Sequence, residues 1–272
     1  MVKYSVYLGQ LQHYLETMKV IIVPVLDDNF AYLLVDESGV TAAVDPAQPE
    51  KIIEAATAEE LHVTKVLTTH KHHDHAGGNN KIASMIDGIE IVGGETEHVQ
   101  GCTRTVRDGD TISVGSISVR CLHTPGHTMG HICYYATEGD QKAVFTGDTL
   151  FVGGAGKFFE GTPAHMQLSL ADKLGKLPPE TLVYCGHEYT AANYLFAQSV
   201  DPDNENLRRE VKRASEILGK GGHTVPSTIA KELATNPFMR AHEPSLQACT
   251  GLGPQASTAT HLGRIREMKN AF

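Results

Sequence analysis

Tryptophan is absent from this 272-residue sequence, and aromatic residues make up only 6% of it. A chain of this length can bury one large core or two modest ones. Because hydrophobic residues still amount to 41%, that core must be filled mainly by aliphatic side chains. The five cysteines are odd in number and form no CxxC pair. This spacing argues against a disulfide framework or a cysteine zinc site and predicts free thiols in a reducing compartment.

Long runs of one residue class are also missing. No stretch approaches the roughly 20 apolar residues of a membrane span, so we expect no membrane partner. No long basic run is present, and 23 basic against 32 acidic residues give a formal net charge of −9. This balance argues against a nucleic-acid partner. Residues 1–17 lack the apolar core and cleavage site of a secretory signal. We interpret them as an N-terminal appendage and expect a cytoplasmic protein, with a mitochondrial fraction left open.

The rest of the chain mixes predicted strands and helices. Strands are predicted at 19–25, 31–35, 41–44, 65–67, 117–122, 131–135, 142–145 and 181–185, and helices at 49–61, 76–86 and 163–174. The order lacks the regular alternation of a doubly wound fold, so stacked sheets with helices outside fit better. Beyond about Glu188, segments 188–199, 204–219, 227–235 and 258–270 are predicted helical and no strand is expected. The sequence therefore predicts an α+β domain at 18–188 and a helical domain at 189–272.

Four of the fifteen histidines fall within residues 70–75. His70 and His72 lie two apart, so in an extended segment they point to the same side. Asp74 and His75 follow in a tight loop before the next predicted helix. Imidazole and carboxylate groups at a strand end suit borderline divalent metals. A solvated polar turn is the alternative for this motif taken alone.

Three other predicted strands also end at a ligand-type residue. His127 follows a Thr-Pro-Gly turn, Asp148 follows a glycine after an apolar strand, and His187 follows Cys-Gly. A neighbouring glycine permits close backbone approach. Each residue taken singly is better explained as an ordinary turn residue than as a ligand. Four such strand ends in one chain argue against coincidence.

Seven candidate ligands exceed the four or so that one zinc ion takes. They suit two ions that share a carboxylate, and Asp148 is the expected bridge because a neutral imidazole cannot bind two ions. A hydroxide between the ions would be the nucleophile, since metal binding brings the pKa of water from about 15.7 to near 7. We assign catalytic roles to Asp74 and Asp148. His123 and His131, which flank the His127 turn, are interpreted as structural or orienting residues.

The order of these residues resembles the metallo-β-lactamase superfamily. Their contexts, TTHxHxDHAGG, TPGHTxGH, FTGDTLF and YCGHEYT, resemble the glyoxalase II (hydroxyacylglutathione hydrolase) family within it. The resemblance runs from about Met18 to the C-terminus. It implies an αββα sandwich of two mixed sheets with a C-terminal helical domain covering the site. It also implies one ion held by His70, His72 and His127, and a second by Asp74, His75 and His187, with Asp148 bridging. We expect two divalent ions, with zinc ahead of iron and manganese.

The family's glutathione-binding positions match Lys157, Phe159, Tyr189, Arg266 and Lys269. Phe159 falls where some members carry Tyr, so a phenol hydrogen bond is lost there. Glutathione thioesters are net anions, and Arg266 and Lys269 lie three apart on one face of a predicted helix. With Lys157 they would supply a positive pocket in an acidic chain. Ordinary surface charges on a terminal helix are the alternative on spacing alone.

The resemblance implies hydrolysis of 2-hydroxyacyl-glutathione thioesters, S-D-lactoylglutathione to D-lactate and glutathione, the second step of methylglyoxal detoxification. We expect a monomer that takes a small glutathione thioester. A persulfide dioxygenase of the same superfamily is the alternative enzyme, but it leaves Lys157 and the Arg266/Lys269 pair unexplained. A β-lactamase shares that defect, and a nuclease also conflicts with the acidic charge. A non-catalytic metal-binding protein is the remaining alternative, although a storage site needs no open position for water.

Overall fold

The computed structural model describes residues 18–253 and 255–272, so the predicted appendage at 1–17 lies outside the described residues. Most of the strands form two six-stranded sheets. The first contains, in spatial order, β1 (Lys19–Val25), β2 (Asn29–Val35), β3 (Val40–Val44), β4 (His62–Leu67), β5 (Glu90–Gly94) and β6 (Arg104–Val106). The second contains β14 (Ser227–Thr228), β13 (Leu182–Cys185), β10 (Gln141–Gly147), β9 (Ile132–Glu138), β8 (Ile117–His123) and β7 (Thr111–Val114). A small hairpin pairs β11 (Leu150–Phe151) with β12 (Gly154–Ala155).

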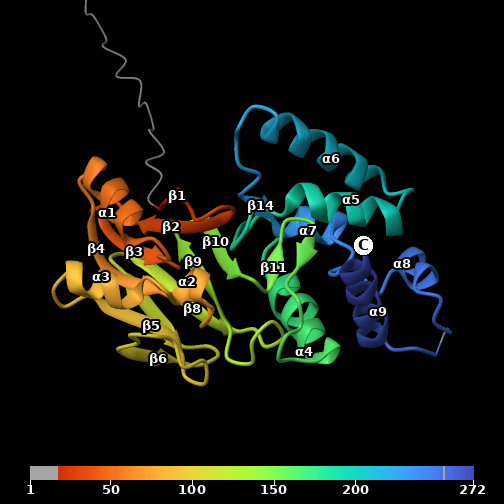
Figure 1. Ribbon diagram of the computed structural model, residues 1–272, viewed down its shortest axis with the longest axis horizontal. Helices are drawn as coiled ribbons and strands as arrows, with labels where there is room; N and C mark the ends of the chain where they lie inside the picture. The colour runs from red at the N-terminus through yellow and green to blue at the C-terminus, as the bar shows by residue number, and fades with distance from the viewer. Residues whose placement is uncertain (1–17, 254) are drawn as a thin grey trace, which may run out of the picture.

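Helices lie outside the sheets (Figure 1). Those before β13 are α1 (Pro49–Ala58), α2 (His73–Ala76), α3 (Asn79–Met85) and α4 (Pro163–Gln167), which continues through a wide turn at Leu168–Lys173 and a tight turn at Leu174–Lys176. Those of the C-terminal part are α5 (Thr190–Val200), α6 (Glu205–Leu218), α7 (Ile229–Thr235), α8 (Pro244–Cys249) and α9 (Thr258–Ala271). The predicted αββα sandwich with a helical C-terminal region is confirmed.

Strand alternation explains the layers. Side chains of successive strand residues point to opposite faces. In β2, Tyr32 and Leu34 enter the core between the two sheets, whereas Ala31 and Leu33 pack under α1 and α3. A third apolar cluster covers the outer face of the second sheet, where Val144 of β10 packs with helical residues. Helical members of that cluster include Met166, Leu170, Phe196, Leu246, Leu262 and Ile265, and Phe238 joins them from the turn after α7. The C-terminal helices are therefore the outer layer on the second sheet.

One expectation for the C-terminal region is wrong. Residues 227–228 form the short strand β14, which pairs antiparallel with β13 through Leu182–Thr228 and Val183–Ser227. A two-residue strand is too short to show an alternating pattern, and the helix predicted at 227–235 begins only at Ile229. Helix α8 was also not predicted, because it is only six residues long.

Parallel strands bring the ligand-bearing loops to one edge. β4 pairs parallel with β3 and β5, and β10 pairs parallel with β13. Because parallel strands end at the same edge, the residues after β10 and β13 must emerge side by side. The isolated bridge between Asn29 and His187 joins the two sheets at that edge.

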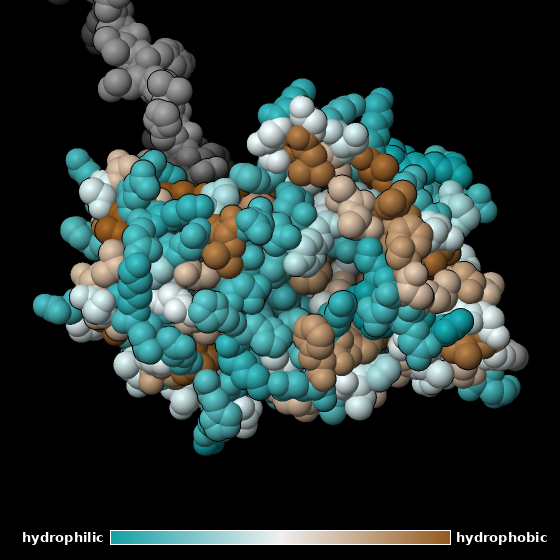
Figure 2. Space-filling model, viewed as in Figure 1, coloured by the Kyte–Doolittle hydropathy of each residue, from teal (hydrophilic) through white to brown (hydrophobic). Residues whose placement is uncertain are grey.

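The surface is mainly hydrophilic over the sandwich, and apolar residues gather on the helical side around α5 and α6 (Figure 2). Leu195 of α5 is 60% exposed there. Cys121, Cys133 and Cys185 are buried, and all five cysteines are free thiols. Within the described ranges, no helix combines the length and apolarity that a membrane crossing requires.

Candidate metal centre

Four strand ends deliver the candidate ligands to one place. His70 lies three residues beyond β4, and α2 then carries Asp74 and His75. The loop after β8 carries His127, while Asp148 directly follows β10. His187 lies two residues beyond β13. The imidazoles of His70, His75, His127 and His187 and the carboxylate of Asp148 are all at most 6% exposed. The convergence expected from the sequence is present.

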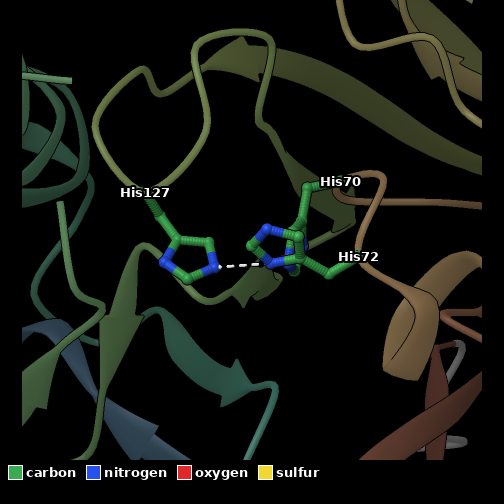
Figure 3. Close-up of side chains that lie close together, drawn as sticks. All are labelled: His70, His72 and His127. Carbon is green, nitrogen blue, oxygen red and sulfur yellow. Dashed lines mark hydrogen bonds between the residues drawn. The ribbon is translucent and has the colours of Figure 1, made fainter. Parts of the chain in front are cut away.

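The first cluster consists of three histidines. His72 Nδ1 lies 3.0 Å from His70 Nε2 and 2.9 Å from His127 Nε2. Figure 3 shows the three rings turned toward one another from two separate loops. The ring planes are near perpendicular, at 79° to 86°, so nitrogen atoms rather than ring faces converge. This arrangement is that of three ligands around one point.

The second cluster combines a carboxylate with two histidines. His187 Nε2 lies 3.3 Å from both His75 Nε2 and Asp74 Oδ2. Asp148 lies between the clusters. Its Oδ1 is 3.3 Å from His75 Nε2 and 3.5 Å from His187 Nε2, whereas its Oδ2 is 3.5 Å from His127 Nε2. One carboxylate thus presents one oxygen to each cluster.

The chemistry of this donor set fits two divalent cations. Asp148 Oδ1 is buried and accepts no hydrogen bond from the described residues, which is costly for a carboxylate oxygen without a partner. The outer ring nitrogens are occupied: His127 Nδ1 lies 2.9 Å from Lys157 O, and His75 Nδ1 lies 2.9 Å from Asp45 Oδ2. A ring that donates from Nδ1 leaves the Nε2 lone pair free for a metal.

Burial and neighbouring charges shift the pKa values of the two clusters in different directions. Burial, assisted by the neighbouring His75, lowers the pKa of His70 well below its usual value, and burial also lowers the pKa of His127. Burial opposes protonation of His187 too, but Asp148 and Asp74 outweigh it and raise its pKa to about 10. Burial acts against ionisation of Asp148, yet the surrounding imidazoles hold its pKa well below the usual value. His70 and His127 are therefore held in their neutral forms, whereas the second cluster attracts positive charge.

Three polar residues orient the ligands, and sequence reasoning missed two of them. Asp45, which directly follows β3, accepts hydrogen bonds from the Thr69 amide and hydroxyl, besides facing His75. Asp28, in the turn between β1 and β2, has its Oδ1 2.9 Å from His187 Nδ1. Both follow or join strands at the same edge as the ligands, which was the available signal. His131 stacks on His70 with ring centroids 5.0 Å apart, as an orienting residue would.

The five expected substrate-binding residues line one cavity of about 300 Å³ together with His127 and Asp148. The Arg266 guanidinium is mostly buried, donates to Ala155 O at 2.9 Å, and lies over the Phe238 ring. Lys269 Nζ donates to Ala192 O at 2.8 Å. The cavity is therefore lined both by the cations Lys157, Arg266 and Lys269 and by the carboxylate of Asp148.

Two aromatic rings of this cavity contact candidate ligands. Tyr189 stacks on His187 with centroids 4.6 Å apart. Phe159 is 64% exposed, and its ring lies 5.2 Å from that of His127 and 5.8 Å from that of His72. The phenylalanine thus keeps a ring contact with the three-histidine cluster without the hydroxyl that Tyr would bring.

Comparison with known proteins identifies the family. The metallo-β-lactamase superfamily model matches residues 26–187, and the hydroxyacylglutathione hydrolase C-terminus model matches residues 188–272. A cytoplasmic hydroxyacylglutathione hydrolase of Arabidopsis thaliana is 47% identical over 257 residues, covering 93% of this chain and 97% of the relative. The chain belongs to the hydroxyacylglutathione hydrolase family. A family member from Dictyostelium discoideum is 40% identical, with 94% of this chain and 100% of that protein covered.

Solved structures share the fold. The crystal structure of ETHE1 from Myxococcus xanthus has a TM-score of 0.62 at 25% identity, covering 93% of this chain and 100% of that one. The BLEG-1 B3 metallo-β-lactamase also has a TM-score of 0.62, at 20% identity, covering 81% of this chain and 99% of that one. Family membership and the three overlapping groups of His and Asp ligands indicate a dinuclear metal site, and the protein is a metal-dependent hydrolase.

Proposed function

We propose that the protein hydrolyses 2-hydroxyacyl-glutathione thioesters, with S-D-lactoylglutathione giving D-lactate and glutathione in the second step of methylglyoxal detoxification. The relatives' names support the substrate class. The observation that carries the proposal is the cavity itself, because Lys157, Arg266 and Lys269 line it together with Asp148. In a chain of net charge −9, this local set of cations suits the carboxylates of glutathione.

We assign one ion to His70, His72 and His127 and the other to Asp74, His75 and His187, with Asp148 shared. Zinc is the proposed metal, since a site rich in imidazole with carboxylates suits it. When bound, two divalent cations bring the pKa of water toward neutrality and polarise a carbonyl oxygen. In this assignment Asp74 and Asp148 supply the negative charge that keeps both cations in place.

The side chains of the cavity orient the thioester. The cations at the far end draw in the carboxylates of glutathione, and the Tyr189 and Phe159 rings border the path toward Asp148. The thioester carbonyl then lies beside His127 and Asp148 at the inner end. Overall, the oxygen of water adds to the carbonyl carbon, the carbon–sulfur bond breaks, and the sulfur leaves as a thiolate that takes up a proton. Because a thiolate leaves readily, the cavity requires no strong general acid.

A thiol-release assay on the purified protein tests the proposal. We expect S-D-lactoylglutathione to release thiol, chelation to abolish the release, and zinc reloading to restore it at two ions per chain. A thioester whose thiol carries no carboxylate should be a much poorer substrate because it cannot use the cations. Full turnover after metal removal would refute the metal centre, and equal kcat/KM for both thioesters would refute the cavity assignment. Oxygen consumption with a persulfide, without thiol release, would favour the dioxygenase alternative.

We also infer a monomeric, cytoplasmic protein with a helical substrate-binding domain at 189–272. The Arabidopsis thaliana relative is named cytoplasmic. Arg266 and Lys269, on α9, supply two of the three cations of the cavity.

A further inference from the structure

Glu97 is a fully buried carboxylate outside the set of candidate ligands. It lies three residues beyond β5 and has no exposed surface. Its Oε1 accepts hydrogen bonds from the Lys71 amide at 2.9 Å and the Thr128 hydroxyl at 2.6 Å. Its Oε2 accepts from the Gly130 amide at 2.9 Å. A buried charge costs several kcal/mol unless it is well paired, and these donors supply the pairing.

The three donors come from the two loops that hold the three-histidine cluster. Lys71 lies between His70 and His72, so its amide sets the orientation of the peptide that joins them. Thr128 directly follows His127. These loops are 55 or more residues apart in the chain, and the carboxylate of Glu97 joins them with one rigid planar group.

The Glu97 turn and the His127 loop pack closely against each other. A Cβ on Gly130 would lie 2.5 Å from Glu97 Oε2 and 2.6 Å from the Glu97 amide nitrogen. A Cβ on Gly94, at the end of β5, would lie 2.3 Å from Gly130 O. The Glu97 turn and the His127 loop are therefore in direct contact, and a shift of one must move the other.

A carboxylate can accept hydrogen bonds at both of its oxygens, whereas an amide can accept at only one of the two positions. Both carboxylate oxygens accept hydrogen bonds, so Glu97 serves the two loops at once. In Glu97→Gln one of the two groups becomes an NH2 donor that faces an N–H or O–H donor. The substitution has the same size, but it must lose at least one backbone hydrogen bond: that of the Gly130 amide if the NH2 takes the place of Oε2, or that of the Lys71 amide if it takes the place of Oε1.

We propose that Glu97 is a positioning residue that sets the distance between His70/His72 and His127 and so holds the ion of that cluster. The proposal rests on the proposed metal centre. Residues that orient metal ligands change metal affinity by about 10–100-fold when they are substituted. Glu97 acts through the backbones of both loops, so its loss should affect the three-histidine ion and spare the ion of Asp74, His75 and His187.

The test is withdrawal of zinc from the loaded full-length protein by increasing chelator. Glu97→Gln should release one zinc ion at about 10–100-fold lower chelator concentration than wild type, while the second ion is retained normally. Thr128→Val removes a single donor to Oε1, so a smaller loss of the same ion is expected. This variant keeps the test valid if Glu97→Gln does not fold.

Asp36→Asn is the matched control. Asp36 is also a buried carboxylate with bonds to three backbone amides, those of Ser38, Val40 and Ser116, but it lies away from the metal centre. It should lower the free energy of unfolding and leave both zinc ions in place. If Glu97→Gln holds both ions as firmly as Asp36→Asn does, Glu97 has only a structural role and the inference is overturned. A wild-type chain that binds fewer than two ions would overturn the metal centre itself, and the inference with it.

Discussion

If Lys269 binds the thioester as proposed, substrate binding should depend on pH. Its ammonium lies in the cavity, over the rings of Phe196 at 5.3 Å and Phe272 at 5.8 Å. Burial lowers the pKa of Lys269 to about 8, and the nearby Arg266 guanidinium adds to the effect. The ammonium of the free protein is therefore present below pH 8 and is lost above it. An anionic thioester binds the charged form, so binding weakens as the pH rises through 8.

The size of the effect follows from that titration. Between pH 7 and pH 9 the charged fraction of Lys269 falls from about nine-tenths to about one-tenth, which gives roughly a tenfold rise in KM. The kcat should change little over the same range, because a bound carboxylate keeps the ammonium protonated. The measurement is initial-rate thiol release from S-D-lactoylglutathione at saturating zinc, corrected for spontaneous hydrolysis at each pH.

Two variants test whether the titration of Lys269, rather than that of another group, causes the rise in KM. Lys269→Arg stays charged throughout this range, so its KM should be nearly constant where the wild-type KM rises. Arg264→Ala removes an exposed α9 cation that is paired with Glu267, and its pH profile should match wild type. The reasoning would be refuted by a Lys269→Arg variant whose KM rises as steeply as that of the wild type, since the titrating group would then be the substrate or another residue.

Two further predictions concern the metal bridge and the hairpin beside the cavity. Asp148→Ala should remove metal and activity together, with a loss of turnover greater than the 10–100-fold expected for an orienting residue; metal analysis and thiol release check this, and a metal-poor variant with wild-type turnover would contradict it. Asn236→Ala should lower the free energy of unfolding by about 2–4 kcal/mol, because the buried carbonyls of Phe151 and Gly154 lose the amide that donates to both. Denaturant unfolding measures this loss, and a change below about 1 kcal/mol would show that those carbonyls find other donors.

Much of the sandwich was predictable because local pattern and burial agree. The predicted strand at 19–25 coincides with β1, and the alternation in β2 is matched by side chains that enter two different cores. The failures lie where the pattern is too short to read. β14 owes its existence to pairing with β13, and α8 is confined to the residues between Pro244 and Cys249. Such elements are fixed by tertiary contacts, so propensity alone does not reveal them.

In the candidate site, too, some residues could be predicted from the local sequence and others could not. Residue type and strand-end position were enough to select the seven ligand candidates, because few other roles explain histidine and aspartate at four strand ends. Nothing local distinguishes Asp45 or Glu97 from an ordinary turn acid. Their partners, His75 for one and Thr128 for the other, lie about 30 residues away in the chain. Orienting residues are defined by distant partners, and a single sequence does not name those partners.

The proposed substrate cavity is lined by residues from both sides of the boundary near residue 188, so it does not belong to the C-terminal region alone. The β11–β12 hairpin leads from Asp148 to Lys157, and the C-terminal region fixes it through buried hydrogen bonds. Its anchors are Gly153 N to Glu232 Oε2, Asn193 Nδ2 to Val152 O and Arg266 to Ala155 O. Arg266 thus both faces the cavity and holds the segment that delivers Lys157. Because the same helices also form the outer apolar layer on the second sheet, displacing them would disperse the binding cations even if the metal ligands stayed in place.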